Sequence, residues 1–254
     1  MTIKINTLNT RAPEGITKSG IKDEFDALTS ELKELVTKMY ANKDHNLLIV
    51  LQGMDSSGKD GVSKAVFSKV SPTMVSAYSF RKPTDEEFAH DFLWRVHKQA
   101  PAKGTVKIYV RSHYEDILIQ RVHNWIDEDR VSMRIEAINA YEKLLEADNN
   151  TIVMKFFLNL SKEKQKEKLI ERIERREKNY KHNDGDWKER EHWDSYMHVY
   201  EDAMNRSAIP WIPVAADQRW YRNYQVAKAV VERLRSLNLE FPPLEEEPNI
   251  DLNA

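Results

Sequence analysis

Residues suited to phosphate chemistry are concentrated in one short segment, Gly53-Met54-Asp55-Ser56-Ser57-Gly58-Lys59. Its glycine and lysine spacing is that of a Walker A phosphate loop. The glycines let successive backbone N–H groups face inward around an anion, and the lysine can reach a transferred phosphoryl group. The competing interpretation is a glycine-rich turn with a surface lysine. We expect phosphate contacts from Gly53, Met54, Ser56, Ser57, Gly58, Lys59, Asp60 and Gly61.

The residue that follows the lysine departs from the usual loop. Asp60 stands where a Ser or Thr normally holds magnesium. Asp55, inside the loop, offers a carboxylate instead, and Mg²⁺ prefers oxygen ligands completed by phosphate and water. A carboxylate in the cradle would repel a polyanion unless a cation lay between them. We therefore expect Asp55 to bind Mg²⁺, for which Mn²⁺ could substitute.

The loop lies between a predicted strand and a predicted helix. Residues 47–51 form an apolar run that ends at a glycine, which is typical of a parallel strand buried on both faces, and a helix is expected over 59–70. Further strands are expected at 73–80, 105–110, 151–158 and 211–215, and further helices at 21–40 and 226–237. Alternating strands and helices predict an α/β fold with a parallel sheet covered on both faces.

Composition excludes several classes of protein. The 254 residues carry a formal net charge of −2 and contain no cysteine, so there is no disulfide, no thiolate metal site and no cysteine nucleophile. The start of the chain has no apolar stretch of a signal peptide, and no segment approaches the roughly 20 apolar residues of a membrane span. We expect a soluble, cytoplasmic protein that binds neither membranes nor nucleic acid.

The chain is expected to form one domain with an embedded mobile segment. Residues 1–20 are predicted to be an N-terminal arm or loose lead-in, 21–238 the phosphate-loop domain, and 239–254 a poorly ordered acidic tail. Within the domain, residues 162–206 are dense in charge. They are predicted to form two helices joined at a turn over 183–185, as a lid would.

Several motifs in order resemble the polyphosphate kinase 2 family. The resemblance is carried by the loop and its strand at 47–61, by Ser79-Phe-Arg-Lys-Pro-Thr and His90-Asp-Phe-Leu-Trp-Arg95, by Arg111-Ser-His-Tyr-Glu-Asp-Ile117, by Ile138-Asn-Ala-Tyr-Glu142, and by Lys188-Glu-Arg-Glu-His-Trp-Asp-Ser-Tyr196. It covers roughly residues 47–237. The Arg-Ser-His-Tyr-Glu-Asp form is similar to the class III subgroup, whose members phosphorylate nucleoside mono- and diphosphates.

This resemblance implies more than the residues do alone. It implies a three-layer α/β/α sandwich like that of nucleotide monophosphate kinases, a helical lid, Mg²⁺ dependence, and a homo-oligomer, either dimer or tetramer. The implied reaction transfers the terminal phosphate of inorganic polyphosphate to AMP or ADP. The alternatives are an ATP-dependent nucleoside monophosphate kinase, against which Asp60 counts, and a non-catalytic polyphosphate-binding protein.

The family's Walker B element falls at residues 105–116. Phosphoryl transfer needs positioning and charge neutralisation more than a general base, because the attacking nucleotide phosphate is already an anion. Glu115 and Asp116 are the candidates to join Asp55, and Asp116 is our predicted second metal ligand. Without the family, capping of the following helix explains either carboxylate equally well. Val110 stands where other members have Asp or Asn, and valine cannot bind metal.

Basic residues outside the loop are predicted to bind phosphates. Arg111 and Arg121 are placed near the transferred group, where a guanidinium can engage two oxygens, and Arg81 and Lys82 near the acceptor's phosphate. Their alternative is an exposed surface position. In the lid, the predicted contacts to the donor chain are Lys178, Lys181, Lys188 and Arg190, with Asp186 at an acidic position of the family's lid tip.

Overall fold

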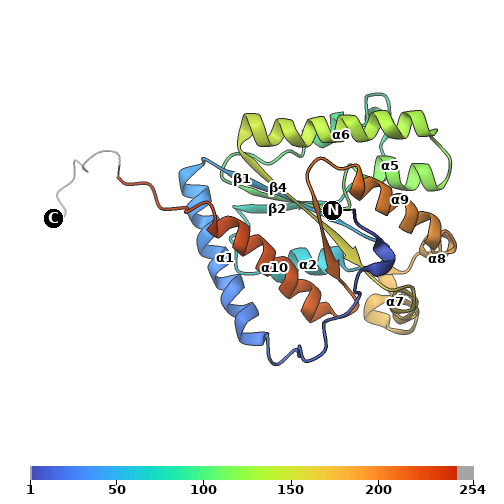
Figure 1. The fold of residues 1–254 in the computed structure, drawn as a ribbon, viewed down its shortest axis with the longest axis horizontal. Helices are drawn as coiled ribbons and strands as arrows, with labels where there is room; N and C mark the ends of the chain where they lie inside the picture. The colour runs from blue at the N-terminus through green and yellow to red at the C-terminus, as the bar shows by residue number, and fades with distance from the viewer. Residues whose placement is uncertain (1, 245–254) are drawn as a thin grey trace.

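The computed structural model describes residues 2–244. They form a five-stranded parallel sheet with helices around it (Figure 1). The strand order is β2-β3-β1-β4-β5. The strands are β1 (Asn46–Gln52), β2 (Val75–Tyr78), β3 (Val106–Val110), β4 (Thr151–Asn159) and β5 (Trp211–Ala215). All of the predicted strands are therefore confirmed. The phosphate loop follows β1, the central strand, where ligands of doubly wound sheets are expected to bind.

Helices cover both faces of the sheet, which confirms the three-layer α/β/α prediction. In Figure 1, α1, α2 and α10 lie on one side of the strands, and α5, α6 and α9 lie on the other. The helices are α1 (Lys22–Asn42), α2 (Lys59–Val66), α3 (Asp85–Phe88), α4 (Trp94–His97), α5 (Glu115–Val122), α6 (Glu128–Asn149), α7 (Lys162–Glu174), α8 (Asp184–Glu191), α9 (Trp193–Asn205) and α10 (Arg219–Arg235), with 3₁₀ turns η1 (Ile5–Thr7) and η2 (Arg176–Lys181).

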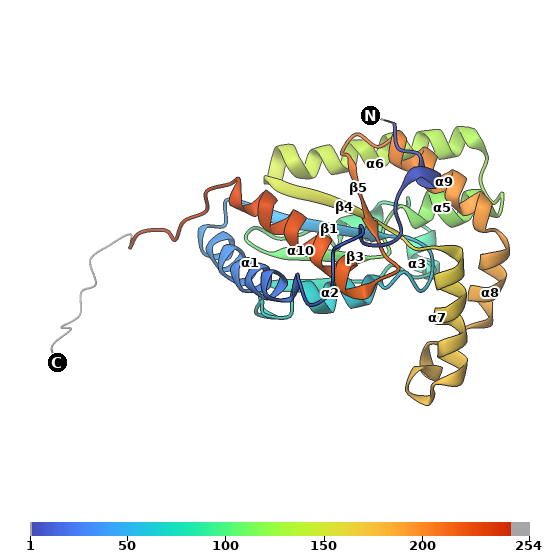
Figure 2. The same cartoon turned by 60° about the horizontal axis from the view of Figure 1, so that its bottom comes forward.

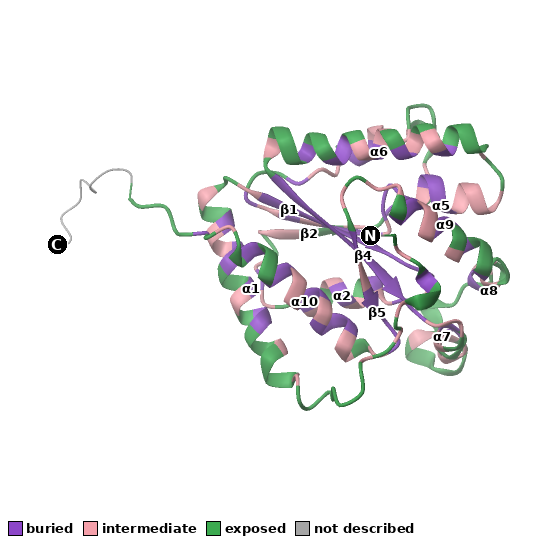
Figure 3. Ribbon diagram, viewed as in Figure 1, coloured by how far each residue is buried: buried purple, intermediate pink, exposed green. Residues whose placement is uncertain are grey.

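The side chains of β1 show why an apolar run is needed at the centre of the sheet. Leu47, Ile49 and Leu51 pack into the cluster that includes α1, α2 and α10. The intervening Leu48 and Val50 pack into the cluster beneath α5, α6 and α9. Every residue of β1 is buried, as Figure 3 shows for the central strands. A strand with two buried faces fixes the start of the phosphate loop firmly.

Three predicted helices are present with altered ends. The helix expected over 21–40 is α1, and the one expected over 59–70 ends earlier, at Val66. Pro72 follows shortly afterwards and disfavours helical conformation in the residue before it. The helix expected over 226–237 begins earlier, at Arg219, so Trp220, Tyr221 and Tyr224 lie along its first turns.

The first part of the expected N-terminal arm is docked on the body of the protein. Ile5 is buried, and its N–H donates to Glu201 on α9 at 2.8 Å. The Thr10 hydroxyl and the Thr10 carbonyl both bond to Asp217 beside the N-terminus of α10. Hydrogen bonds to α9 and to the segment before α10 therefore hold residues 3–12 against the body of the protein.

The charged segment is more divided than the two predicted helices. The structure has α7, the 3₁₀ turn η2, α8 and α9 in its place. The expected turn at 183–185 is instead the start of α8, because the Asn183 side chain accepts the N–H of Gly185 and caps the helix. The last helix, α9, buries Trp193, Tyr196 and Tyr200 against the sheet and so belongs to the body of the domain.

The end of the chain is described only in part. Residues 239–244 have no regular secondary structure, and the remainder of the expected acidic tail, 245–254, lies outside the described residues. Among residues 2–244, no helix combines the length and apolar character required to cross a membrane.

A charged network lies buried between β4 and α6. Lys155, on β4, donates to Glu142 of α6 and to the Tyr114 hydroxyl, and His113 pairs with Glu142 at 3.2 Å. The Lys155, Glu142 and His113 side chains have no exposed surface. Desolvation opposes ionisation of Glu142, but the His113 hydrogen bond and the Lys155 charge hold its pKa below the ordinary value. The network anchors residues 113 and 114, which precede Glu115.

Replacing Glu142 by Gln should destabilise the fold by about 3–5 kcal/mol, because Lys155 would remain buried without a counter-charge. Glu146→Gln, at an exposed position of the same helix, is the control. Urea unfolding measures both. The pKa of Glu142 is lower in the folded chain, so its contribution is complete above the ordinary value of 4.5 and is lost as pH falls through the folded value. Equal losses in the two variants would contradict this.

Candidate active site

The phosphate loop has the backbone of an anion cradle. Gly53, Ser56 and Gly58 all have positive φ, at 143°, 67° and 92°, and α2 begins at Lys59. Alternation between left- and right-handed backbone turns successive N–H groups toward one point. Among the described residues, the N–H of Ser57 alone in the stretch 54–59 donates to another backbone group, the carbonyl of Met54. The other N–H groups remain available to a ligand.

Lys59 is held inside the cradle. Its side chain is buried, and Nζ donates to the carbonyls of Gly53 at 2.6 Å and Met54 at 3.3 Å. Burial lowers the pKa of Lys59, while the Asp55 carboxylate opposes that change. Within the described residues, the Ser56 and Ser57 hydroxyls are buried without a hydrogen-bond partner. Buried polar atoms without partners are expected where a ligand supplies the missing bonds.

A pocket opens over the loop. It brings together residues from four parts of the chain: the loop, the segment after β3, the end of α8, and α9. Its lining consists of Gly53, Met54, Asp55, Lys59, Arg111, Glu115, Ile119, Glu189, Tyr196 and Tyr200. Of the predicted catalytic residues, Asp55, Lys59 and Arg111 therefore meet in one place.

Arg111 and Asp55 form the charged centre of this pocket. The Nη2 of Arg111 lies 2.7 Å from Oδ1 of Asp55. Desolvation works against ionisation of Asp55, but Lys59 and Arg111 outweigh it and lower the Asp55 pKa. Arg111 has φ +65°, a strained conformation for a residue with a β-carbon. This strained residue directly follows β3, and its guanidinium is directed at the phosphate loop.

Glu115, not Asp116, faces the pocket. Burial raises the pKa of Glu115, although Arg111 and Lys59 oppose the change. The expectation that Asp116 lies beside Asp55 is wrong. Asp116 is buried and pairs with Nη2 of Arg95 at 2.9 Å, and it also accepts from Gln120 at 3.1 Å. Neighbouring helix residues point about 100° apart, so only one of the two carboxylates can face the loop.

Glu189, Tyr196 and Tyr200 were not predicted as site residues. Glu189, on α8, accepts from the Tyr196 hydroxyl at 2.6 Å and faces Nε2 of His123 at 3.0 Å. Burial raises the pKa of both tyrosines, which remain neutral hydrogen donors. Glu189 and Tyr196 belong to the 188–196 motif that carries the family resemblance, but only the basic residues of that motif were predicted to bind phosphate.

Several predicted phosphate contacts lie elsewhere. Arg121 is paired with Glu128 at 2.6 Å and Asp202 at 2.7 Å, so its guanidinium is already neutralised outside the pocket. Arg81 and Lys82 are exposed in the loop after β2 and do not line the pocket. Among the loop residues, Asp60 is exposed in the first turn of α2, and Gly61 follows it.

Val110 does not line the pocket. It pairs in register with Leu51 and packs among the apolar residues beneath α2. Its missing carboxylate therefore does not leave a gap among the pocket residues.

None of the predicted lid residues lines the pocket over the phosphate loop. Figure 2 shows α7 and α8 side by side, extending away from the sheet. Lys181 and Lys188 are exposed, and Lys178 pairs with Glu171 on α7. Two members hold the helices together instead. Asp186 is buried and pairs with Arg172, and Arg190 donates to the carbonyl of Lys162 at 2.6 Å.

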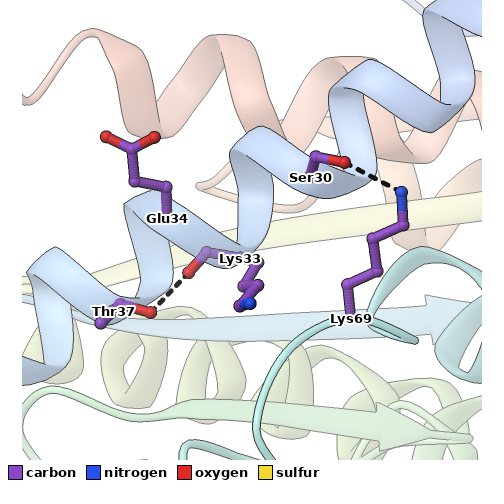
Figure 4. A pocket seen from close by; sticks show the side chains of 5 residues that line it. All are labelled: Ser30, Lys33, Glu34, Thr37 and Lys69. Carbon is purple, nitrogen blue, oxygen red and sulfur yellow. Dashed lines mark hydrogen bonds between the residues drawn. The ribbon is translucent and has the colours of Figure 1, made fainter.

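A second hollow is remote from this chemistry. It lies on the outer side of α1 and is lined by Ser30, Lys33, Glu34, Thr37 and Lys69 (Figure 4). Lys69 is already paired with Asp26 at 2.7 Å and donates to Ser30 at 2.9 Å. None of the residues predicted to bind phosphate lines it. The pocket over the phosphate loop remains the candidate active site.

The pocket residues fit a hard cation bound together with phosphate. No cluster of three potential ligands among histidine and carboxylate residues occurs in the part of the chain that the structure describes. Magnesium needs no such cluster, because it commonly binds through one or two carboxylates plus substrate phosphates and water. Asp55 and Glu115 supply carboxylate oxygens beside the unpartnered loop hydroxyls.

Comparisons with known proteins agree on one family. The family model described as polyphosphate kinase 2 matches residues 15–242. An AMP/ADP-polyphosphate phosphotransferase from Meiothermus ruber is 40% identical over 228 residues, covering 89% of this chain and 85% of the relative. An ADP-polyphosphate phosphotransferase from Rhodopseudomonas palustris is 35% identical, covering 83% and 78%. A crystal structure of polyphosphate kinase 2 from Arthrobacter aurescens superposes with a TM-score of 0.93 at 36% identity, covering 97% and 90%.

Replacing Gly58 by Ala should abolish most phosphate binding. A β-carbon there would lie 2.8 Å from Cζ of the buried Arg222, at a φ that costs a β-carbon about 1–2 kcal/mol. Displacement of the loop should lower any phosphoryl-transfer activity by about 100-fold. Gly15→Ala is the matched control, because Gly15 has φ +85° in open space. Phosphate binding, activity and thermal stability are measured for the two variants. A fully active Gly58→Ala protein would contradict the account.

Proposed function

The chain belongs to the polyphosphate kinase 2 family, and we propose that it transfers the terminal phosphate of inorganic polyphosphate to nucleoside mono- and diphosphates. The observation that carries the proposal is the pocket in which Lys59, Asp55, Arg111 and Glu115 converge on an anion cradle. Relatives named for AMP and ADP phosphorylation support the acceptor class.

The chemistry is a single displacement at phosphorus. A phosphate oxygen of the nucleotide attacks the terminal phosphorus of the chain, the bond to the bridging oxygen breaks, and polyphosphate leaves one unit shorter. The N–H groups of the loop and the Lys59 ammonium surround oxygens of the donor, where negative charge builds up. Arg111 brings a second cation from the end of β3. The neutral hydroxyls of Tyr196 and Tyr200 close the opposite wall of the pocket.

A Mg²⁺ ion is the expected cofactor, with Mn²⁺ as a substitute. We assign its protein ligands to Asp55 and Glu115, because both carboxylates line the pocket and Asp116 does not. When bound, such an ion neutralises phosphate charge. Arg111 now occupies one oxygen of Asp55, so binding of metal and substrate would require that ion pair to loosen.

The ATP-dependent kinase remains the alternative within the same fold. Both enzymes would share the sheet, loop and helical lid, and the exposed Asp60 is the feature that separates this loop from the usual one. The test supplies AMP or ADP with polyphosphate and Mg²⁺ but no ATP, and follows ADP and ATP by chromatography. Product formation is expected; its absence, together with product from ATP and AMP, would favour the alternative.

Lys59→Ala should lower the turnover rate by about 10²–10³-fold, as loss of one donor to developing charge does in other enzymes. Lys64→Ala, which removes an exposed lysine from the same helix, should leave the rate unchanged.

Glu115→Gln should raise the Mg²⁺ concentration required for half-maximal rate, whereas Asp116→Asn should chiefly lower the melting temperature by freeing Arg95. The reverse pattern for the two carboxylates would show that our metal assignment is wrong.

We also infer that the chain self-associates through the outer face of α6. An apolar stripe there alternates four- and three-residue spacing, as helices that pair in coiled coils do, and faces away from the sheet. Met133 and Leu144 are each 51% exposed. Figure 3 shows exposed positions along the outer side of this helix. The stripe consists of Met133, Ala137, Ala140, Leu144 and Ala147.

An antiparallel pair of α6 helices about a two-fold axis at Ala140 would be self-complementary. Large residues of the stripe would face the small residues of the second copy, as an isologous interface requires. Exposed charges flank the stripe in matching order, so that Glu136 would face Lys143, and Arg130 would face Asp148, across the interface. This charge pattern favours a second copy over another protein partner.

Lys143→Glu should therefore weaken the dimer, because two acidic side chains would face each other, and Glu136→Lys added to it should restore association. Analytical ultracentrifugation measures both, with Lys166→Glu, at an exposed lid position, as the control. A wild-type chain that remains monomeric at all accessible concentrations would contradict this interface.

A further inference from the structure

The carbonyl groups of the phosphate loop are all held by donors. A loop that directs its N–H groups to an anion must direct its carbonyls elsewhere, because a carbonyl oxygen facing the anion would repel it. Lys59 takes the first two, those of Gly53 and Met54. The next three accept hydrogen bonds from side chains that are remote in sequence. Gln165 donates to Asp55 at 3.2 Å, Lys168 to Ser56 at 3.3 Å, and Arg222 to Ser57 at 2.8 Å.

Arg222 is a buried cation without an anionic partner. It reaches from α10 to the underside of Gly58 with 2% of its surface exposed, and its other donors bond to the neutral amide of Asn223. No described carboxylate lies within ion-pair distance of it. Burial lowers the pKa of Arg222 to about 10, and Arg219 adds to the effect. An uncompensated buried charge is unfavourable, so an anion in the loop above it would be the compensating charge.

Gln165 and Lys168 tie the loop to the lid. Both lie on α7, one helical turn apart, and Gln165 is completely buried. The Oε1 of Gln165 accepts from Arg190 of α8 at 2.9 Å, so that one side chain joins the second lid helix to the loop. Lys168 is half-buried in a basic environment. Burial lowers its pKa to about 8, with Arg222, Lys164 and Arg219 acting in the same direction and Asp217 against it.

We propose that Gln165, Lys168 and Arg222 are positioning residues that hold the loop carbonyls away from bound phosphate and supply uncompensated positive charge beneath it. They act through the backbone of residues 55–57 and do not touch the reacting atoms. The lid therefore contributes to phosphate binding at its base, through Gln165 and Lys168 of α7. The inference rests on the proposed phosphate-binding function of the loop, but it does not depend on which nucleotide is the acceptor.

The test measures binding of inorganic tripolyphosphate by titration calorimetry, independently of turnover. Lys168→Met should weaken binding by about tenfold, which corresponds to loss of one charge-assisted hydrogen bond. Arg222→Lys keeps the charge but loses the fork that bonds Ser57 and Asn223 together, and should weaken binding to a smaller extent. Lys166→Met, an exposed lysine of α7, is the matched control and should bind as the wild type does.

Two further readouts separate positioning from a purely structural role. Tripolyphosphate should raise the melting temperature of the wild type more than that of Lys168→Met. A purely structural role would lower the melting temperature of Lys168→Met by the same amount with and without tripolyphosphate. The difference in affinity between wild type and Lys168→Met should also shrink as pH rises through about 8, because wild-type Lys168 then loses its proton. The charged groups that face the Lys168 ammonium in the wild type are Arg219 and Arg222 of α10, Asp217 before that helix, and Lys164 of α7.

Normal tripolyphosphate affinity in folded Lys168→Met would overturn the proposal, whatever the outcome for Arg222→Lys. Because Lys168 is only half-buried, this variant is expected to fold even if substitution of Arg222 is not tolerated. A wild-type chain that binds tripolyphosphate but phosphorylates neither AMP nor ADP would refute the proposed reaction and leave the positioning role intact.

Discussion

The direction of the peptide groups between Gly53 and Lys59 is the constraint on which the site depends. Positive φ at Gly53, Ser56 and Gly58 allows the N–H groups to face one point. The arrangement persists because each carbonyl that faces the other way has a donor of its own, from Lys59 or from side chains of α7 and α10. The double-sided burial of β1 fixes where the loop begins, and the buried network of Lys155 and Glu142 fixes the segment that carries Arg111 and Glu115.

The part of this arrangement that the sequence could predict is the part that is local. The phosphate loop is one continuous segment, so the spacing of its glycines and lysine is visible without knowledge of the fold. The strands were predictable because parallel strands buried on both faces need unbroken apolar runs, as residues 47–51 and 151–158 show. Arg111 was predicted from its place in the family motif, and the structure puts its guanidinium 2.7 Å from Asp55 of the loop.

The errors concern contacts that depend on side-chain direction or on remote partners. Glu115 and Asp116 are adjacent, and the partners that hold Asp116 away from the pocket, Arg95 and Gln120, are not evident from the sequence. Arg121 was expected at the phosphates from its place in the family motif, and nothing local reveals Asp202, with which it pairs. Arg222 lies more than 160 residues beyond the loop that it supports. No local pattern distinguishes it from the other arginines of α10.

The central claim is that the loop backbone, and not the exposed lysines of the lid tip, forms the main binding site for phosphate. Amide resonances of the ¹⁵N-labelled protein, followed during titration with tripolyphosphate and Mg²⁺, test it directly. The account predicts the largest shifts, with slowed hydrogen exchange, at the N–H groups of residues 54–59. Shifts confined to residues 176–181 at the lid tip, with the loop amides unchanged, would contradict it.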